Sequence, residues 1–205
     1  TWAGVVEVVE EGVDQGWDGG ELCYVDAEDD GYRSDTRATV GRADLDGTDS
    51  GEAESTDPVS DCDDTDGAAW PGATEVVDDG VDQDCDGGDL CYQDSDDDGY
   101  RPDGTSTVGS ADLDCADNGE AKSTDPVTDC DDTNGAIYPG AVEIAGDEVD
   151  QDCDGGEVCY VDADDDGYRP DSTSTVASAD VDCTDSGEAG ASVPVGDCDD
   201  ADSAF

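Results

Sequence analysis

The chain has no histidine and no methionine, and only six of its 205 residues are lysine or arginine. Large apolar residues are scarce: 21 valines, 4 leucines, 2 isoleucines and 1 phenylalanine make 28 together. No apolar run approaches the length of about 18 residues that a membrane-spanning helix needs. The lack of histidine removes the imidazole ligands that copper and zinc prefer, and no nucleophile–base pair or phosphate-binding loop is visible. We therefore expect neither membrane insertion nor an enzyme.

Acidic residues are abundant instead. The 61 aspartates and glutamates give a formal charge of −55, which disfavours nucleic acid as a partner. A chain so charged and so poor in apolar side chains is normally disordered, because burial cannot offset the loss of backbone entropy. If this chain folds, covalent cross-links and bound cations must supply the free energy.

The ten cysteines are the first of these two sources. There are no C-x-x-C pairs and no histidines, which argues for disulfides over a zinc module. Disulfides imply an oxidising compartment, so we expect an extracellular protein, secreted or at the cell surface. Periodicity and proximity predict the pairs Cys62–Cys85, Cys130–Cys153, Cys91–Cys115 and Cys159–Cys183. Cys23 and Cys198 are left over, either free, paired between chains, or mismatched through the sequence itself.

The sequence repeats at one fixed interval, which separates Cys23 from Cys91 and Cys91 from Cys159, with no insertion or deletion. The predicted units are 1–68, which is divergent, 69–136 and 137–204, and Phe205 starts the next repeat in phase. Both ends of the chain fall at the same point inside a motif. This register predicts either a window on a longer array or head-to-tail association of identical subunits, which would propagate into a filament.

Glycine, aspartate and serine interrupt the chain every few residues and indicate loops. Short strands are expected at 90–92 and 105–108 and at their copies, with little helix beyond one possible turn at 75–77. The predicted fold class is a mostly irregular, calcium-stabilised tandem repeat, solenoid-like or rod-like, with short β-strands and disulfides. The periodic aromatics should form a small packing nucleus in each repeat. Arg33, Arg101 and Arg169 each follow Gly-Tyr and are expected to bridge nearby carboxylates.

The first of four acidic clusters reads D-x-D-x-D-G. Alternate carboxylates at positions 1, 3 and 5 can converge on one cation, and the glycine permits the sharp turn that follows. A solvated acidic loop would require neither the alternation nor the glycine. The predicted metal ligands of this cluster are Asp26, Glu28 and Asp30, then Asp94, Asp96 and Asp98, then Asp162, Asp164 and Asp166.

The second cluster has the same pattern with a cysteine inside the loop. Its predicted ligands are Asp82, Asp84 and Asp86, then Asp150, Asp152 and Asp154, with only Asp14 and Asp18 kept in the first unit. The third cluster reads D-C-D-D and is followed further along the chain by a glutamate that is expected to close it as a bidentate ligand. Its predicted ligands are Asp61, Asp63, Asp66 and Glu75, then Asp129, Asp131 and Glu143, then Asp197 and Asp199, with Glu7 as the copy of Glu75. A fourth cluster around Asp112 could bind a cation or merely cap turns.

Oxygen ligands of this kind favour calcium. Copper and zinc prefer imidazole or thiolate, and magnesium prefers a rigid octahedron with retained water. We therefore expect several calcium ions in each repeat.

The stretch DCDDTDGAAWPGATEVVDDGVDQDCDGG at 61–88, with its copy at 129–156, resembles the bacterial metal-binding repeat of MopE-type surface proteins. The DSDDDGY segment resembles the thrombospondin type 3 calcium repeat. Together these resemblances imply a secreted, calcium-dependent and mostly irregular protein. MopE-type proteins are linked to copper, but the residues that would support copper are absent here.

These observations predict an extracellular calcium-binding structural protein, part of a filament or surface rod and associating with itself. The alternative is a calcium-stiffened spacer in a larger secreted adhesin or enzyme. A third interpretation, acidity that serves solubility in brine, does not explain the D-x-D-x-D-G register.

Overall fold

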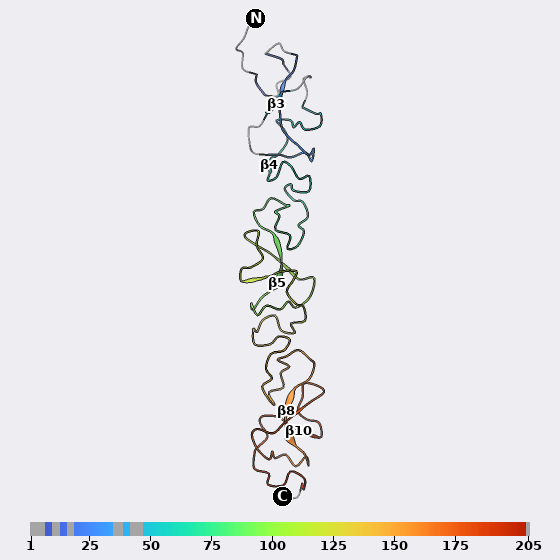
Figure 1. Ribbon diagram of the computed structural model, residues 1–205, viewed down its shortest axis with the longest axis vertical. Helices are drawn as coiled ribbons and strands as arrows, with labels where there is room; N and C mark the ends of the chain where they lie inside the picture. The colour runs from blue at the N-terminus through green and yellow to red at the C-terminus, as the bar shows by residue number, and fades with distance from the viewer. Residues whose placement is uncertain (1–6, 10–12, 16–18, 35–38, 42–46, 204–205) are drawn as a thin grey trace. The chain divides into compact units, whose positions relative to one another are not determined.

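The computed structural model describes residues 7–9, 13–15, 19–34, 39–41 and 47–203. None of these residues is helical, and loops connect short strands throughout (Figure 1). The strands are β1 (Leu22–Tyr24), β2 (Arg33–Ser34), β3 (Thr39–Gly41), β4 (Val59–Asp61), β5 (Leu90–Asp94), β6 (Thr107–Gly109), β7 (Gly119–Ala121), β8 (Val158–Asp162), β9 (Thr175–Ala177) and β10 (Gly187–Ala189). A search of the described residues finds no helix that could cross a membrane.

The strands form four small sheets, ordered β1-β3, β2-β4, β6-β5-β7 and β10-β8-β9. In the last of these, β8 pairs antiparallel with both β9 and β10. Strand β5 occupies the same place in its repeat as β8 does in the next, and it pairs antiparallel with β7 in the matching register. The second and third repeats therefore each contain a three-stranded sheet, and in both sheets the long central strand pairs in the same register. The strand predicted at 90–92 lies inside β5, and the one predicted at 105–108 overlaps β6.

The chain divides into two compact units. The first comprises residues 1–91 and 109–115, and the second comprises residues 92–108 and 116–205. The limits of the sequence repeats and the solenoid-like or rod-like arrangement stay predictions.

The buried apolar side chains are almost all small. Among the described residues they are alanines and cysteines, with Ile137 as the single larger one. Cys23, Cys91 and Cys159 are the largest side chains that are fully buried, whereas Val142 is 87% exposed and Ile144 61% exposed. The apolar core is thus too small to offset the entropy of ordering the chain, as the composition predicts.

All four predicted disulfides are present. Cys62–Cys85 and Cys130–Cys153 each span a sequence separation of 23, and the other two each span 24. By the chain-entropy estimate, each such loop contributes about 3 kcal/mol. Of the two remaining cysteines, Cys198 has an exposed free thiol, and Cys23 is fully buried.

The aromatic rings stack between successive predicted repeats and not within each one as expected, and the arginines do not act as predicted. Tyr32 stacks on Trp70 at 5.7 Å between ring centroids, and Tyr100 stacks on Tyr138 at 5.5 Å. Each Gly-Tyr-Arg guanidinium lies over a tyrosine ring and donates hydrogen bonds to backbone carbonyls. The expected bridging of carboxylates is therefore wrong, since the guanidinium finds fixed carbonyl acceptors close by.

Candidate metal centres

The D-x-D-x-D-G loops keep the same backbone hydrogen bonds in all three repeats. In repeat 2, Asp94 Oδ2 accepts from Gly99 N at 3.0 Å, and Asp98 Oδ1 accepts from Tyr100 N at 2.8 Å. Asp97 and Gly99 turn the chain with φ of 61° and 88°, values that aspartate and glycine tolerate best. The equivalent bonds to Asp26, Asp30, Asp162 and Asp166 measure between 2.7 and 3.0 Å. The first and fifth positions of each loop therefore hold the turn, and in repeats 1 and 3 the first aspartate does so with both oxygens, since Asp26 Oδ1 and Asp162 Oδ1 also accept from Asp29 N and Asp166 N.

Several other carboxylate oxygens of these loops are buried without a hydrogen bond. In repeat 2 they include Asp94 Oδ1 and Asp98 Oδ2, and Asp94 as a whole is only 4% exposed. A buried anionic oxygen without a partner is strongly unfavourable, so each requires a positive charge. The same condition holds for oxygens of Glu28, Asp30, Asp96 and Asp164.

The first aspartate of the D-C-D-D segment joins this loop instead of forming a separate site. Carboxylate oxygens of Glu28, Asp61 and Asp64 all lie within 4.8 Å of one another, and so do those of Asp26, Glu28 and Asp30. Asp61 is far from Asp26 in sequence, and parallel pairing of β2 with β4 brings the two segments together. We call this arrangement the composite site. Its members in repeat 1 are Asp26, Glu28, Asp30, Asp61 and Asp64. The same positions interact electrostatically in the other repeats, which gives Asp94, Asp96, Asp98 and Asp129 in repeat 2, and Asp162, Asp164, Asp166 and Asp197 in repeat 3.

The pKa shifts have the pattern that convergence of carboxylates produces. Burial, and next the charge of Asp61, raise the pKa of Glu28 to about 7. Burial, and next the charge of Asp129, raise the pKa of Asp96. In repeat 3, burial raises the pKa of Asp164, followed by the charges of neighbouring carboxylates that include Asp197. Mutual repulsion of this kind is what a bound cation would relieve.

Neighbouring carboxylates in one loop shift in opposite directions. Hydrogen bonds from Ser50 Oγ at 2.6 Å and Gly51 N at 2.6 Å lower the pKa of Asp29. Burial raises the pKa of the next residue, Asp30, in spite of a hydrogen bond from Tyr32. Asp29, at the fourth loop position, thus accepts hydrogen bonds from the protein and fixes the loop, whereas one oxygen of Asp30, at the fifth position, has no hydrogen-bond donor.

The second cluster forms another carboxylate group, which we call the loop site. Oxygens of Glu75, Asp82 and Asp84 lie within 4.8 Å of one another. Glu75 Oε1 accepts from Asp84 N at 2.8 Å, while Glu75 Oε2 is buried without a hydrogen bond. The prediction that Glu75 closes the Asp61 loop is therefore wrong, because the backbone of the second cluster binds this glutamate.

The loop site recurs in the third repeat. Asp152 N donates to Glu143 Oε1 at 2.9 Å, and Gly155 N donates to Asp150 Oδ2 at 2.8 Å. Glu143 Oε2 is buried without a hydrogen bond, like Glu75 Oε2. Cys153, which follows Asp152, has a φ of 58°, so this half of the disulfide lies at a residue in the left-handed region.

Other predicted ligands cap turns. Asp63 and Asp131 accept hydrogen bonds from the hydroxyls of Thr65 and Thr133, at 2.7 and 2.6 Å. Five other predicted ligands make similar short-range hydrogen bonds. Asp86 accepts from Gly88 N, Asp154 from Gly156 N, Asp66 from Ala68 N and Asp14 from Gly19 N, while Asp199 N donates to Asp197. Glu7 lies among the described residues, and Asp18 lies outside them. Asp14 makes the same bond to a loop glycine that Asp82 and Asp150 make in the loop sites, so it has the corresponding place in repeat 1.

Sequence reasoning missed two kinds of acidic residue. Asp64 was passed over in favour of its neighbours, yet it lies within the composite site of repeat 1. Asp89 and Glu157 are each 3% exposed and accept hydrogen bonds from Gly80 N and Val149 N. Both stand at the same point of their repeats, directly before a strand, and that recurrence was the available signal.

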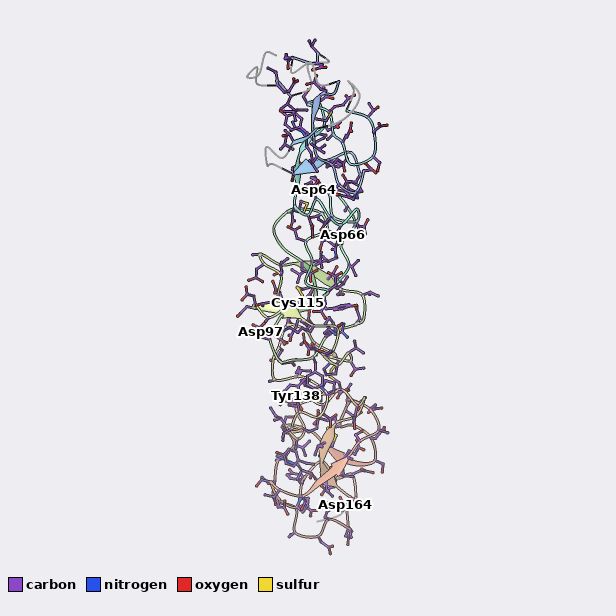
Figure 2. The ribbon with its side chains drawn as sticks, turned by 45° about the horizontal axis from the view of Figure 1, so that its top comes forward. Asp64, Asp66, Asp97, Cys115, Tyr138 and Asp164 are labelled. Atoms are coloured by element: carbon purple, nitrogen blue, oxygen red, sulfur yellow. A yellow bond between two sulfur atoms is a disulfide. The ribbon has the colours of Figure 1, made fainter. Side chains whose placement is uncertain are left out.

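The donor chemistry fits hard cations. Asp61 lies close to the sulfurs of Cys62 and Cys85, but these sulfurs are joined in a disulfide and offer no thiolate. The chain has no imidazole, and the grouped donors of the composite and loop sites are carboxylate oxygens. Figure 2 shows oxygen-bearing side chains along both units, with Asp64 and Asp164 labelled. Calcium and magnesium accept such ligands, and copper does not prefer them.

Comparison with known families bears on two segments of the chain. Residues 61–89 and 129–158 each match the family model Cu-binding_MopE, described as "Putative metal-binding motif". Neither the curated proteins nor the solved structures gave a match. The matched segments contain the loop sites and supply Asp61 and Asp64 to the composite site of repeat 1 and Asp129 to that of repeat 2, while the D-x-D-x-D-G loops lie outside them. The chain therefore carries two copies of the MopE-type metal-binding motif that its sequence resembles.

Proposed function

We propose that this chain is an extracellular calcium-binding structural protein, whose bound ions hold its loops in place. The observation that carries the proposal is the composite site. In it, two segments that are distant in sequence bring together carboxylates whose buried oxygens, such as Asp94 Oδ1 and Asp129 Oδ2, accept no hydrogen bond. The buried Arg101 of the same repeat donates to backbone carbonyls, so neutralisation of these oxygens is left to a bound cation.

Calcium suits these sites better than other hard cations. The composite site is formed by loops with four or more carboxylates, and calcium accepts six to eight oxygens in variable geometry. Magnesium requires a near-ideal octahedron and keeps most of its water. We expect dissociation constants on the order of 10⁻⁴–10⁻³ M, as in other extracellular calcium modules.

The role is structural because the chain has little else to stabilise it. Its buried apolar side chains are mainly alanine and cysteine, and its net charge of −55 opposes compaction. The four disulfides support an oxidising, non-cytoplasmic compartment. Disulfides restrict the unfolded chain but do not neutralise buried carboxylates, so the cations must do so. Head-to-tail association into a filament stays part of the proposal, and sedimentation in calcium tests it.

Chelation tests the calcium proposal directly. In low salt with millimolar calcium, the chain should resist protease and show a dispersed NMR spectrum. Excess EDTA should abolish both, and calcium should restore them, whereas equal magnesium or sodium chloride should not. A chain that keeps its protease resistance in excess EDTA would contradict the proposal. Folding in concentrated sodium chloride without calcium would instead support acidity as an adaptation to brine.

A further inference from the structure

One arginine in each repeat makes the same set of contacts three times. Arg33, Arg101 and Arg169 lie with the guanidinium carbon 4.0, 4.2 and 3.9 Å from the ring centroids of Tyr24, Tyr92 and Tyr160. Arg101 and Arg169 are only 8% and 7% exposed. A cation over an aromatic face in a desolvated position is firmly held. The repetition of this geometry within one chain indicates that these arginines have a shared task.

The side chain of each arginine holds a segment that lies well beyond it in the sequence. Arg101 Nε donates to Asp125 O at 2.9 Å, and its Nη2 donates to Ser123 O at 3.2 Å. Arg169 makes the equivalent bonds to Val193 O at 2.8 Å and Ala191 O at 3.2 Å. A planar guanidinium can reach two carbonyls and stack on a ring at once, which an ammonium group cannot do.

The backbone of the same residue holds the end of that segment. Arg101 N donates to Pro126 O at 2.8 Å, and Arg101 O accepts from Thr128 N at 3.0 Å and Asp129 N at 3.2 Å. Arg169 O likewise accepts from Gly196 N at 2.9 Å and Asp197 N at 3.2 Å. The arginine therefore fixes the path of residues 123–129 up to the aspartate that enters the composite site.

We propose that Arg101, and equally Arg33 and Arg169, is a positioning residue of the composite cation site. It touches no ion itself and acts by placing Asp129 opposite the D-x-D-x-D-G loop that ends two residues before Arg101. Asp129 is 6% exposed, and its Oδ2 is buried without a hydrogen bond, so a small displacement removes it from the site. The inference rests on the proposed function, since it assigns the arginine a part in cation binding.

The loop glycines provide a separate reporter for each composite site. Gly31, Gly99 and Gly167 each donate their N–H to the first loop aspartate at 3.0 Å. Calcium titration of the full chain labelled with ¹⁵N-glycine therefore yields three apparent dissociation constants in one experiment. Arg101→Lys keeps the charge but loses the planar guanidinium that reaches both backbone carbonyls. It should weaken calcium binding at Gly99 by about 10- to 100-fold, as loss of an orienting partner does. Gly31 and Gly167 should keep their wild-type values.

Two further variants separate positioning from charge and from general stability. Lys122→Met removes a positive charge from an exposed side chain of the same unit and should leave Gly99 unchanged. Asp129→Asn removes the positioned carboxylate, and adding Arg101→Lys to it should change the constant at Gly99 less than about twofold, because both act through one residue.

The outcomes are distinct. If wild-type Gly31, Gly99 and Gly167 do not respond to calcium, the proposed function fails. If they respond but Arg101→Lys leaves Gly99 unchanged, the positioning role is overturned. An equal loss at all three glycines, or additive losses in the double variant, would show that the arginine acts on overall stability and would also overturn it.

Discussion

Asp129→Asn should have opposite effects on stability with and without calcium. In calcium, the substitution removes one ligand from the composite site of repeat 2. In EDTA, it removes one member of a group of repelling carboxylates. Burial is the larger cause, but the charge of Asp129 also raises the pKa of both Asp96 and Asp98. A residue that only holds a turn would not show this reversal, so the test is specific for a cation site.

The magnitudes follow from linkage and from the pKa shifts. A site saturated at 100 times its dissociation constant stabilises the folded chain by about 2.7 kcal/mol, and Asp129→Asn should lose most of that. Without calcium, the variant should gain on the order of 1 kcal/mol, because one pKa unit corresponds to about 1.4 kcal/mol. The second value is small because Asp129 is one of four carboxylates in the site.

Hydrogen exchange of the Gly99 amide, followed by NMR, measures local opening under both conditions. Glu148→Gln is the matched control, since Glu148 is an exposed acidic residue of the same compact unit outside both kinds of site. It should have little effect in calcium or in EDTA. Destabilisation by Asp129→Asn of equal size in calcium and EDTA would refute the reasoning, because it would mean that Asp129 only holds a turn.

Two other predictions concern individual composite sites. Since the pKa of Glu28 is raised to about 7, calcium must displace a proton below that pH. Calcium affinity at the repeat 1 site should therefore weaken by about tenfold per pH unit below 7 and level off above it. Titration calorimetry in two buffers counts the released protons, and a Glu28→Gln chain with unchanged proton release would contradict this. In repeat 2, Gln93 Nε2 and Ser95 Oγ donate to Asp132 Oδ2 at 2.6 and 2.8 Å. The variant Gln93→Val/Ser95→Ala, which has the residues of repeats 1 and 3, should free Oδ2, while Oδ1 keeps its bond from Ser95 N. Calcium should then bind about fivefold more tightly at Gly99, the equivalent of about 1 kcal/mol of lost hydrogen bonds, and weaker binding would show that Asp132 serves the site better where it is.

The disulfides were predictable because both halves of each pair recur at a fixed interval. Cys85 and Cys153 stand in the same motif, at a separation of 23 from Cys62 and Cys130, and a loop of that length closes at modest entropic cost. The lack of helix followed from the frequency of glycine and aspartate, which favour turns. In both cases, local sequence determines the outcome, and long-range packing adds little.

The grouping of the ligands was less predictable, because it depends on which loops meet. Asp61 approaches Glu28 through the pairing of β2 with β4, strands of two and three residues that carry no hydrophobic pattern. Glu75 was assigned to the Asp61 loop by analogy with a distant closing glutamate, but the backbone N–H of Asp84 binds it instead. A spacing in sequence shows which residues could share an ion, and the turn geometry decides which do.

The disulfides also connect the two kinds of site. Cys62 follows Asp61, a member of the composite site, and Cys85 follows Asp84, a member of the loop site. Cys62 N donates to Cys85 Sγ at 3.2 Å, so the backbone of one segment is tied to the side chain of the other. A cation that orders Asp61 therefore also restricts the loop that carries Asp84. In a chain with almost no apolar core, such linkage would let each bound ion lower the entropy that the next one must overcome, and the covalent bonds and the cations would act together in place of a hydrophobic interior.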